Sequence, residues 1–76
     1  MKYELYEGDA TAAAAVTDLE DNFAAETWAK GWVRDNAKTD RYTLRRTDGA
    51  LTLSIFRTQA GQWYMTPAPA LELQPG

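Results

Sequence analysis

The sequence predicts an α+β fold: a single domain over residues 1–76 in which one helix packs on a mostly antiparallel sheet, in the order β-α-β-β-β. Residues 2–7 alternate polar and apolar side chains, which is typical of a half-buried strand. An apolar stripe with helical spacing follows a capping sequence that begins at Thr17. The dipeptide Asp48-Gly49 then separates two alternating segments, as in a β-hairpin. One helix must cover the apolar face of the sheet, so a two-layer arrangement follows.

The first expected strand, residues 2–7, turns Tyr3 and Leu5 toward one side and ends at Gly8-Asp9. Its other side carries a lysine, a glutamate and a tyrosine, which suits a face in contact with water. The side with the leucine is therefore expected to face the core.

The expected helix begins at Thr17, because the Thr17 hydroxyl is placed to accept from the amide of Glu20 while the Glu20 side chain reaches back. An alternative start near Asp9 or Thr11 makes the alanine run its first turns. The helix is expected to end within residues 31–36. At 100° per residue its apolar side chains form one broad face, consisting of Val16, Leu19, Phe23, Ala25, Ala29, Trp32 and Val33.

Two hairpins are expected after the helix. A type I′ turn at Asp48-Gly49 joins strands over residues 41–47 and 50–58. A three-residue loop over 59–61, with its glycine in the left-handed conformation, leads into the last strand. These turns set the register. The expected cross-strand pairs are Leu44 with Leu53, Tyr42 with Ile55, Arg45 with Thr52, Thr43 with Ser54, Arg41 with Phe56, Ile55 with Met65, Arg57 with Trp63, and Phe56 with Tyr64.

The end of the chain is predicted from its prolines. Pro67 and Pro69 are expected to end the last strand, because proline donates no backbone hydrogen bond. Residues 67–76 are then expected to form a loose tail, or residues 71–73 a short edge strand. The expected core combines both layers and consists of Leu5, Leu19, Phe23, Ala29, Trp32, Leu44, Leu53, Ile55 and Met65.

The composition restricts the chemistry open to the chain, because it contains no histidine and no cysteine. The usual proton shuttle at neutral pH, the commonest metal ligand and the thiolate nucleophile are therefore missing. Carboxylates, hydroxyls, lysine and arginine remain, in no spacing typical of a catalytic motif. We expect no enzyme activity, no catalytic residue, no cofactor and no metal site.

The net charge of −3 is unevenly distributed. Residues 1–26 hold seven acidic side chains against one lysine, a charge of −6, and residues 27–76 hold seven basic against four acidic side chains, a charge of +3. Such a chain either pairs its charges internally or presents two faces of opposite sign. No apolar segment approaches the ~18 residues of a membrane span, and acids rather than bases precede the alanine-rich stretch. A cytoplasmic monomer or homodimer without membrane attachment is expected.

The first candidate site is an acidic surface with one tryptophan: Asp18, Glu20, Asp21, Glu26 and Trp28. The carboxylates gather at the start of the expected helix, and Trp28 lies on the flank of its apolar face. Clustered charge of one sign favours docking on a basic protein surface, and tryptophan is enriched among residues that anchor interfaces. Capping and solubility account for the same carboxylates, and packing over the helix edge accounts for the same tryptophan.

The second candidate site is the outer face of the sheet, where the register places Arg41, Arg45, Phe56 and Tyr64. Basic and aromatic side chains on an open sheet hold single-stranded nucleic acid, because bases stack on the rings and arginines meet the phosphates. A solvated face with ordinary strand-forming residues accounts for the same pattern. The negative net charge opposes the approach of a polyanion, so nucleic-acid binding is the alternative prediction.

The chain as a whole resembles the small proteins that phages and mobile elements encode, among them the anti-CRISPR inhibitors. The resemblance lies in the short length, the acidic charge, the missing cysteines, the alanine-rich first part and the β-α-β-β-β layout. It covers the whole chain and no specific residue motif. It implies a non-enzymatic blocker that occupies a nucleic-acid-binding or assembly surface of a host effector complex. The expected function is therefore a protein-binding inhibitor that docks its acidic surface on a basic surface of such a complex.

Overall fold

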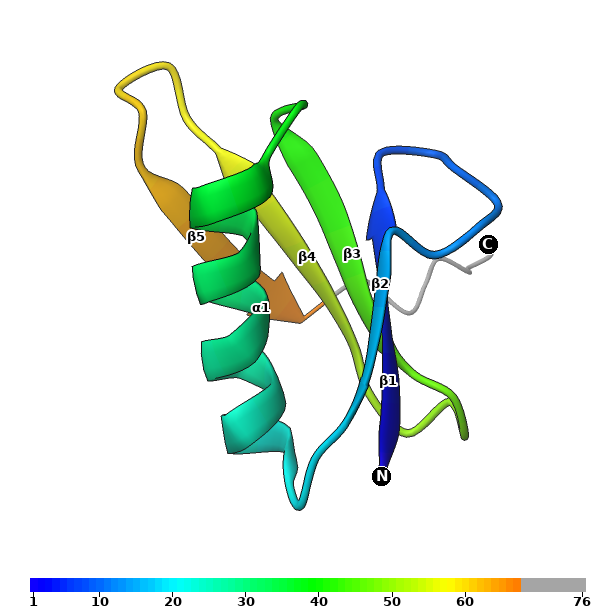
Figure 1. The fold of residues 1–76 in the computed structure, drawn as a ribbon. Helices are drawn as coiled ribbons and strands as arrows, with labels where there is room; N and C mark the ends of the chain where they lie inside the picture. Colours follow the sequence, from blue (N-terminus) through cyan, green and yellow to red (C-terminus); the bar gives the residue numbers. More distant parts are fainter. Residues whose placement is uncertain (68–76) are drawn as a thin grey trace, which may run out of the picture.

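The structure is a computed structural model, and it describes residues 1–67. Its elements are β1 (Lys2–Glu7), β2 (Ala15–Asp18), α1 (Asn22–Asn36), β3 (Arg41–Arg46), β4 (Thr52–Arg57) and β5 (Trp63–Pro67). The predicted α+β class is confirmed, since α1 forms one layer and the antiparallel strands form the other (Figure 1). The last strand ends at Pro67, as expected. The tail predicted beyond it, with the alternative edge strand at residues 71–73, lies outside the described residues.

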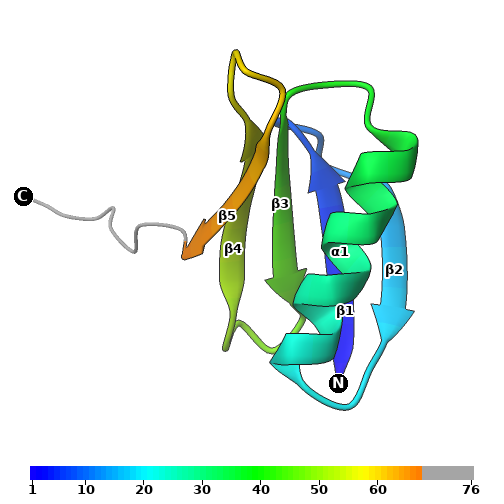
Figure 2. The same cartoon turned by 90° about the vertical axis from the view of Figure 1, so that its left-hand side faces the viewer.

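The sheet has the strand order β2-β1-β3-β4-β5, and every neighbouring pair is antiparallel. Within residues 1–67, α1 covers one face of this sheet and no element covers the other (Figure 2). The predicted registers of both hairpins are confirmed: Ile55, for example, lies opposite Tyr42 on one side and Met65 on the other. Short turns leave few ways to align the strands that they join, so these pairs follow from local sequence.

The turn between β3 and β4 differs from the predicted type I′ geometry. Gly49 has φ +82°, but no residue other than glycine has a positive φ in the described chain. The amide of Gly49 donates to the carbonyl of Arg46, and the amide of Arg46 donates to the carbonyl of Leu51, so the connection is a four-residue loop. The Asp48 carboxylate supports it by accepting from the Arg46 guanidinium at 2.7 Å and from the Ala50 amide at 2.9 Å. The predicted register is unchanged, because the four-residue loop is still centred on Asp48-Gly49 and Arg45 still lies opposite Thr52.

The predicted helix start is wrong, and the chain contains one more strand than predicted. Thr17 lies in β2 opposite Tyr3, so the capping box at Thr17 does not form. The helix begins at Asn22, and Asp21 is its N-cap, with the carboxylate accepting from the Ala24 amide at 2.8 Å. Two β-branched residues, Val16 and Thr17, suit a strand, and pairing with β1 outweighs the local helix signal. The element order is therefore β-β-α-β-β-β.

The core lies between α1 and the covered face of the sheet. Its buried side chains are Tyr3, Leu5, Ala25, Ala29, Val33, Tyr42, Leu44, Leu53 and Ile55. Of the other predicted core residues, Leu19, Trp32 and Met65 pack against this cluster and are partly buried. Phe23 is not a core residue, because 77% of its surface is exposed, and Val16 is 56% exposed. Val16 belongs to a strand, and Phe23 points about 200° around the helix from the buried Ala25.

Replacing the helix cap is expected to destabilise the fold. Asp21→Ala should lower the free energy of unfolding by about 0.5–2 kcal/mol, because the Ala24 amide loses its acceptor. Asp21→Asn keeps an acceptor oxygen and should recover most of this loss. Glu20→Ala removes the neighbouring acid without touching the cap and should change stability by less than about 0.5 kcal/mol. Equal urea midpoints for the alanine variants of Asp21 and Glu20 would contradict the helix start described above.

Candidate functional site

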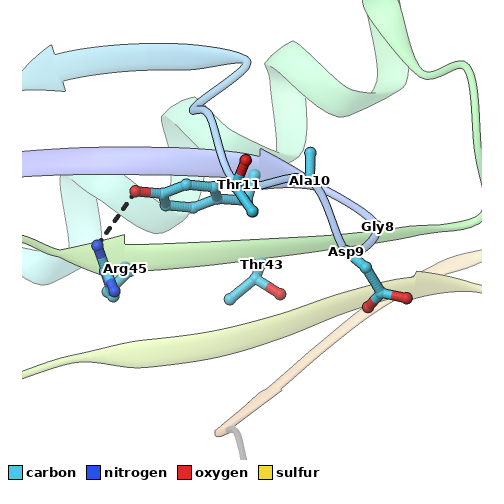
Figure 3. Close-up of a pocket in the computed structure, with 7 residues that line it drawn as sticks. Gly8, Asp9, Ala10, Thr11, Thr43 and Arg45 are labelled. Carbon is cyan, nitrogen blue, oxygen red and sulfur yellow. Dashed lines mark hydrogen bonds between the residues drawn. The ribbon is translucent and has the colours of Figure 1, made fainter.

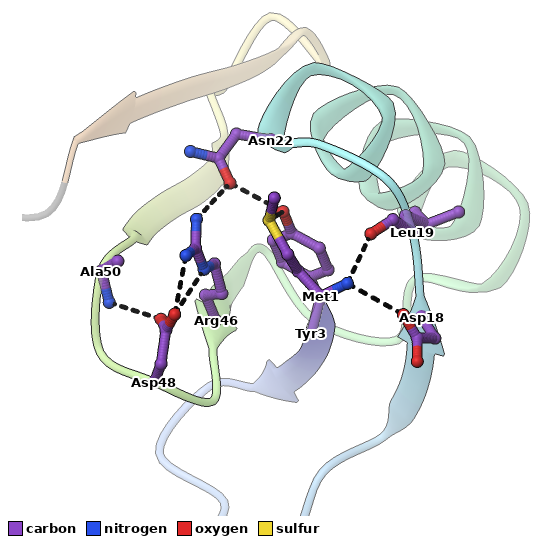
Figure 4. Close-up of polar contacts among 8 residues, drawn as sticks. All are labelled: Met1, Tyr3, Asp18, Leu19, Asn22, Arg46, Asp48 and Ala50. Atoms are coloured by element: carbon purple, nitrogen blue, oxygen red, sulfur yellow. Dashed lines mark hydrogen bonds and ion pairs between the residues drawn. The ribbon is translucent and has the colours of Figure 1, made fainter.

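The structure brings three of the five predicted docking residues together at one edge of the sheet. Asp18 ends β2, and Glu20 and Asp21 form the connection from β2 to α1. Figure 4 shows Asp18 beside the first residue of the chain, where its Oδ1 accepts from the Met1 ammonium at 2.9 Å. This hydrogen bond lowers the pKa of Asp18, so its carboxylate is charged at neutral pH. We call Asp18, Glu20 and Asp21 the acidic edge.

Glu26 and Trp28, the other two predicted docking residues, do not lie on one surface. They are two positions apart in α1, which places them about 200° apart around the helix axis. Glu26 lies one helical turn before Lys30, but within residues 1–67 the two side chains form no ion pair. Trp28 packs against the core on the same flank as Trp32, four residues later.

The flank of α1 that carries the two tryptophans faces the β2 side of the sheet. Trp32 lines a hollow of about 340 Å³ together with Glu7, Ala14 and the end of the helix. Ala14 directly precedes β2, so this flank and the start of β2 bound the same space. Trp28 therefore lies toward the edge strand and the acidic edge, whereas Glu26 lies on the far side of α1.

The arginines are compensated by acidic groups of the chain itself. The ion pairs are Arg34 with Asp35, Arg41 with Asp9, Arg45 with Glu4, Arg46 with Asp48 and Arg57 with Asp40. Two acids of the first 26 residues, Glu4 and Asp9, thus pair with basic residues of β3, which is one of the two arrangements that the uneven charge allowed. Within residues 1–67, Glu20 and Asp21 take part in no ion pair with a basic side chain. Glu20 and Asp21 therefore keep their negative charge, whereas the Asp18 carboxylate is paired with the Met1 ammonium.

The uncovered face of the sheet gathers three of the four residues predicted for nucleic acid. Arg41, Phe56 and Tyr64 lie in one cross-strand row over β3, β4 and β5, and we call them the aromatic row. The two ring centroids are 5.9 Å apart with planes tilted by 32°. The Tyr64 hydroxyl donates to Gln62 at 2.8 Å, and the Arg41 guanidinium donates to Asp9 at 3.1 Å. The aromatic row presents ring faces on which bases could stack, but Arg41, its one cation within residues 1–67, is already paired with Asp9.

Arg45 lies apart from the aromatic row, four residues along β3 from Arg41. Its guanidinium donates to Glu4 and to the Tyr6 hydroxyl, each at 3.1 Å, and stacks 5.2 Å from the centre of the Tyr6 ring. An open hollow of about 420 Å³ on this face is lined by Tyr6, Thr43, Arg45 and the loop over residues 8–11 (Figure 3). This group could not be predicted from local sequence, because it forms only when β1 pairs with β3.

The Glu4–Arg45 pair makes stability depend on pH. The pKa of Glu4 is lowered from the ordinary 4.5, first by the hydrogen bond from Tyr6 and second by that from Arg45. A lowered folded-state pKa gives stability that is present above pH 4.5 and lost as the pH falls through the folded-state value. Between about pH 6 and about pH 3, Glu4→Gln should therefore lose less stability than the unsubstituted protein. Parallel pH profiles of the two urea midpoints would contradict this contribution.

Comparisons with protein-family models, with curated proteins and with solved structures found no match. No helix within residues 1–67 has both the length and the apolar character needed to cross a membrane. In the same residues, no three acidic side chains converge closely enough to hold a metal ion. The two surfaces described above, the acidic edge and the aromatic row, are therefore the candidates for a binding function.

Proposed function

We propose that the chain is a non-enzymatic protein-binding module that docks its acidic edge on a basic surface of a partner protein. One observation carries the proposal: every arginine of the described residues has an acidic partner, whereas Glu20 and Asp21 have no basic one. Uncompensated charge of one sign steers a partner of opposite sign and contributes to its recognition. The acidic edge is the part of the original docking prediction that these unpaired charges support. Glu26 is not part of it, because it lies on the other side of α1 from Trp28.

The size and charge of the chain support a more specific form of this proposal. Small acidic chains of this kind resemble phage and mobile-element inhibitors, whose targets expose basic surfaces that hold nucleic acid or other subunits. In this proposal the chain acts as an inhibitor that covers such a surface on a host effector complex. Electrostatic docking of this type weakens as salt is added.

A capture experiment with two matched charge reversals tests the proposal. Tagged protein is incubated with a bacterial lysate, and the captured proteins are identified by mass spectrometry. Glu20→Lys reverses one charge on the acidic edge, and Asp35→Lys makes the same reversal at the opposite end of α1, where a cation is favourable. We expect the first variant to lose a basic partner that the second retains. Capture that is unaffected by Glu20→Lys, or lost equally in both variants, would overturn the acidic-edge proposal.

The aromatic row supports a second candidate function, binding of single-stranded nucleic acid. Its supporting observation is that Phe56 and Tyr64 present adjacent rings beside Arg41 on an uncovered sheet face. Stacking is worth about 1–3 kcal/mol per base, so Phe56→Ala should weaken binding of a labelled oligonucleotide measured by fluorescence anisotropy. We rank this function second because Arg41 and Arg45 are both paired with acids. Micromolar or tighter binding at physiological salt, lost in Phe56→Ala, would reverse the ranking.

A further inference from the structure

The strand β2 forms one edge of the sheet and is bordered by β1 alone (Figure 2). The Leu19 amide donates to the Met1 carbonyl, and the Met1 amino group donates back to the Leu19 carbonyl. Antiparallel strands alternate such bonded pairs with unbonded ones, so the pair of Tyr3 with Thr17 is bonded as well. The backbone groups of Val16 and Asp18 consequently point away from β1. They present two N–H donors and two carbonyl acceptors along the edge.

The side chains around this edge suit a strand with two different faces. Val16 and Asp18 lie on the uncovered face of the sheet, with 56% of Val16 and 71% of the Asp18 side chain exposed. On the other face, Thr17 points toward α1, whose flank on this side carries Trp28. An added strand therefore meets a carboxylate on one face and apolar surface on the other.

The opposite edge of the sheet, formed by β5, lacks this combination. Its side chains on the uncovered face, Tyr64 and Thr66, carry no charge. Pro67 ends the strand with a nitrogen that has no hydrogen to donate, a common device against edge pairing. β2 has no proline, its last residue is Asp18, and Glu20 and Asp21 follow shortly after it. Charge complementarity therefore favours β2 over β5 as the edge that binds an added strand, and it favours a basic strand.

We propose that β2 is a docking strand, to which an extended basic segment of a partner protein adds as a further antiparallel strand. In this segment lysine or arginine alternates with apolar residues. The basic side chains lie on the uncovered face, where their stems cover Val16 and their charges meet Asp18, and the apolar side chains pack toward Trp28. Cross-strand neighbours of opposite charge favour this alignment, and the main-chain hydrogen bonds supply the rest of the recognition. The inference rests on the proposed protein-binding function, and it specifies the part of the partner that binds: an extended basic segment.

Amide hydrogen exchange measured by NMR tests the strand addition directly. In the free protein, the amides of Val16 and Asp18 should exchange fast and that of Thr17 slowly, because only the latter is bonded to β1. The probe is a short labelled peptide in which lysine alternates with valine, and the control peptide carries glutamate in place of lysine. Saturation with the lysine peptide should slow exchange at Val16 and Asp18, and the glutamate peptide should have no effect. Protection at Trp63 and Met65 instead, or no binding up to about 1 mM peptide, would overturn the proposal.

Two substitutions separate the backbone from the charge contribution. Val16→Pro removes an outward-facing donor without removing a bond to β1, and it should weaken the lysine peptide about tenfold, whereas Val16→Thr should not. Asp18→Asn keeps the backbone and should weaken the peptide about two- to fivefold. An unchanged affinity for the lysine peptide in both Val16→Pro and Asp18→Asn would contradict the proposal. This holds even where one substitution disrupts the structure of β2, because the other still reports its own contribution. A lysate partner that is lost in Glu20→Lys but retained by a folded Val16→Pro would leave the proposed function standing and remove the strand addition.

Discussion

Replacing Ile55 with alanine is expected to lower the free energy of unfolding by about 2–5 kcal/mol. Ile55 is fully buried at the centre of β4, between Tyr42 on β3 and Met65 on β5. The substitution removes three carbon atoms from a site that is closed on one side by α1, so a cavity remains. Urea denaturation monitored by tryptophan fluorescence measures the loss.

The matched control for this prediction lies on the same strand. Thr52 is exposed on the uncovered face, so Thr52→Ala should change the free energy of unfolding by less than about 0.5 kcal/mol. Equal midpoints for the two variants would contradict the burial of Ile55, and a larger loss for Thr52→Ala would mean that β4 turns its other face to the helix. That result would shift the register by one residue and remove the aromatic row together with the core.

Tyr42→Phe is expected to cost about 1–3 kcal/mol, although it removes only one oxygen atom. The fully buried Tyr42 donates its hydroxyl hydrogen to Glu7 at 2.9 Å, and the same oxygen accepts from the Lys38 amide at 2.9 Å. Burial raises the pKa of Tyr42, and the Glu7 hydrogen bond raises it further, so the hydroxyl remains a donor. Phenylalanine leaves both partners without this bond.

Tyr64→Phe is the control for the loss of a hydroxyl. The Tyr64 hydroxyl donates to Gln62 at an exposed position, where water replaces the lost bond. Its free energy of unfolding should therefore stay within about 0.5 kcal/mol of the unsubstituted value. Equal losses for Tyr42→Phe and Tyr64→Phe would show that the connection from α1 to β3 does not depend on the Tyr42 bridge.

The part of the fold that local sequence determines was predicted, and the part that long-range pairing determines was not. The registers from β3 to β5 follow from two short turns, and they were predicted residue by residue. β2 is four residues long and lies in an alanine-rich segment, so its strand signal is weak. Thr17 and Glu20 have the spacing of a capping box, but pairing of Thr17 with Tyr3 decides its conformation. The competition between the capping box and strand pairing becomes visible only when the pairing of β2 with β1 is known.

For the candidate sites, too, the arrangements that depend on local turns were predicted and those that depend on long-range pairing were not. The aromatic row was predicted because the turn that aligns Arg41 with Phe56 is local. The pairing of Arg45 with Glu4 was not predicted, because it joins residues that only the strand order brings together. The acidic surface was predicted as one patch on a helix, and moving the helix start to Asn22 divided it. Asp18 became part of an edge strand, which is the feature that makes it a candidate for strand addition.

An NMR titration of the isotope-labelled protein with the partner captured from lysate tests the central claim, docking through the acidic edge, most directly. We expect the largest changes of backbone amide shifts at Val16, Asp18 and Glu20. Added salt should weaken them, because the docking is electrostatic. The amides of Phe56 and Tyr64, on the uncovered face, should change little. Shifts confined to Phe56 and Tyr64, with the acidic edge unchanged, would contradict the account and assign binding to the aromatic row.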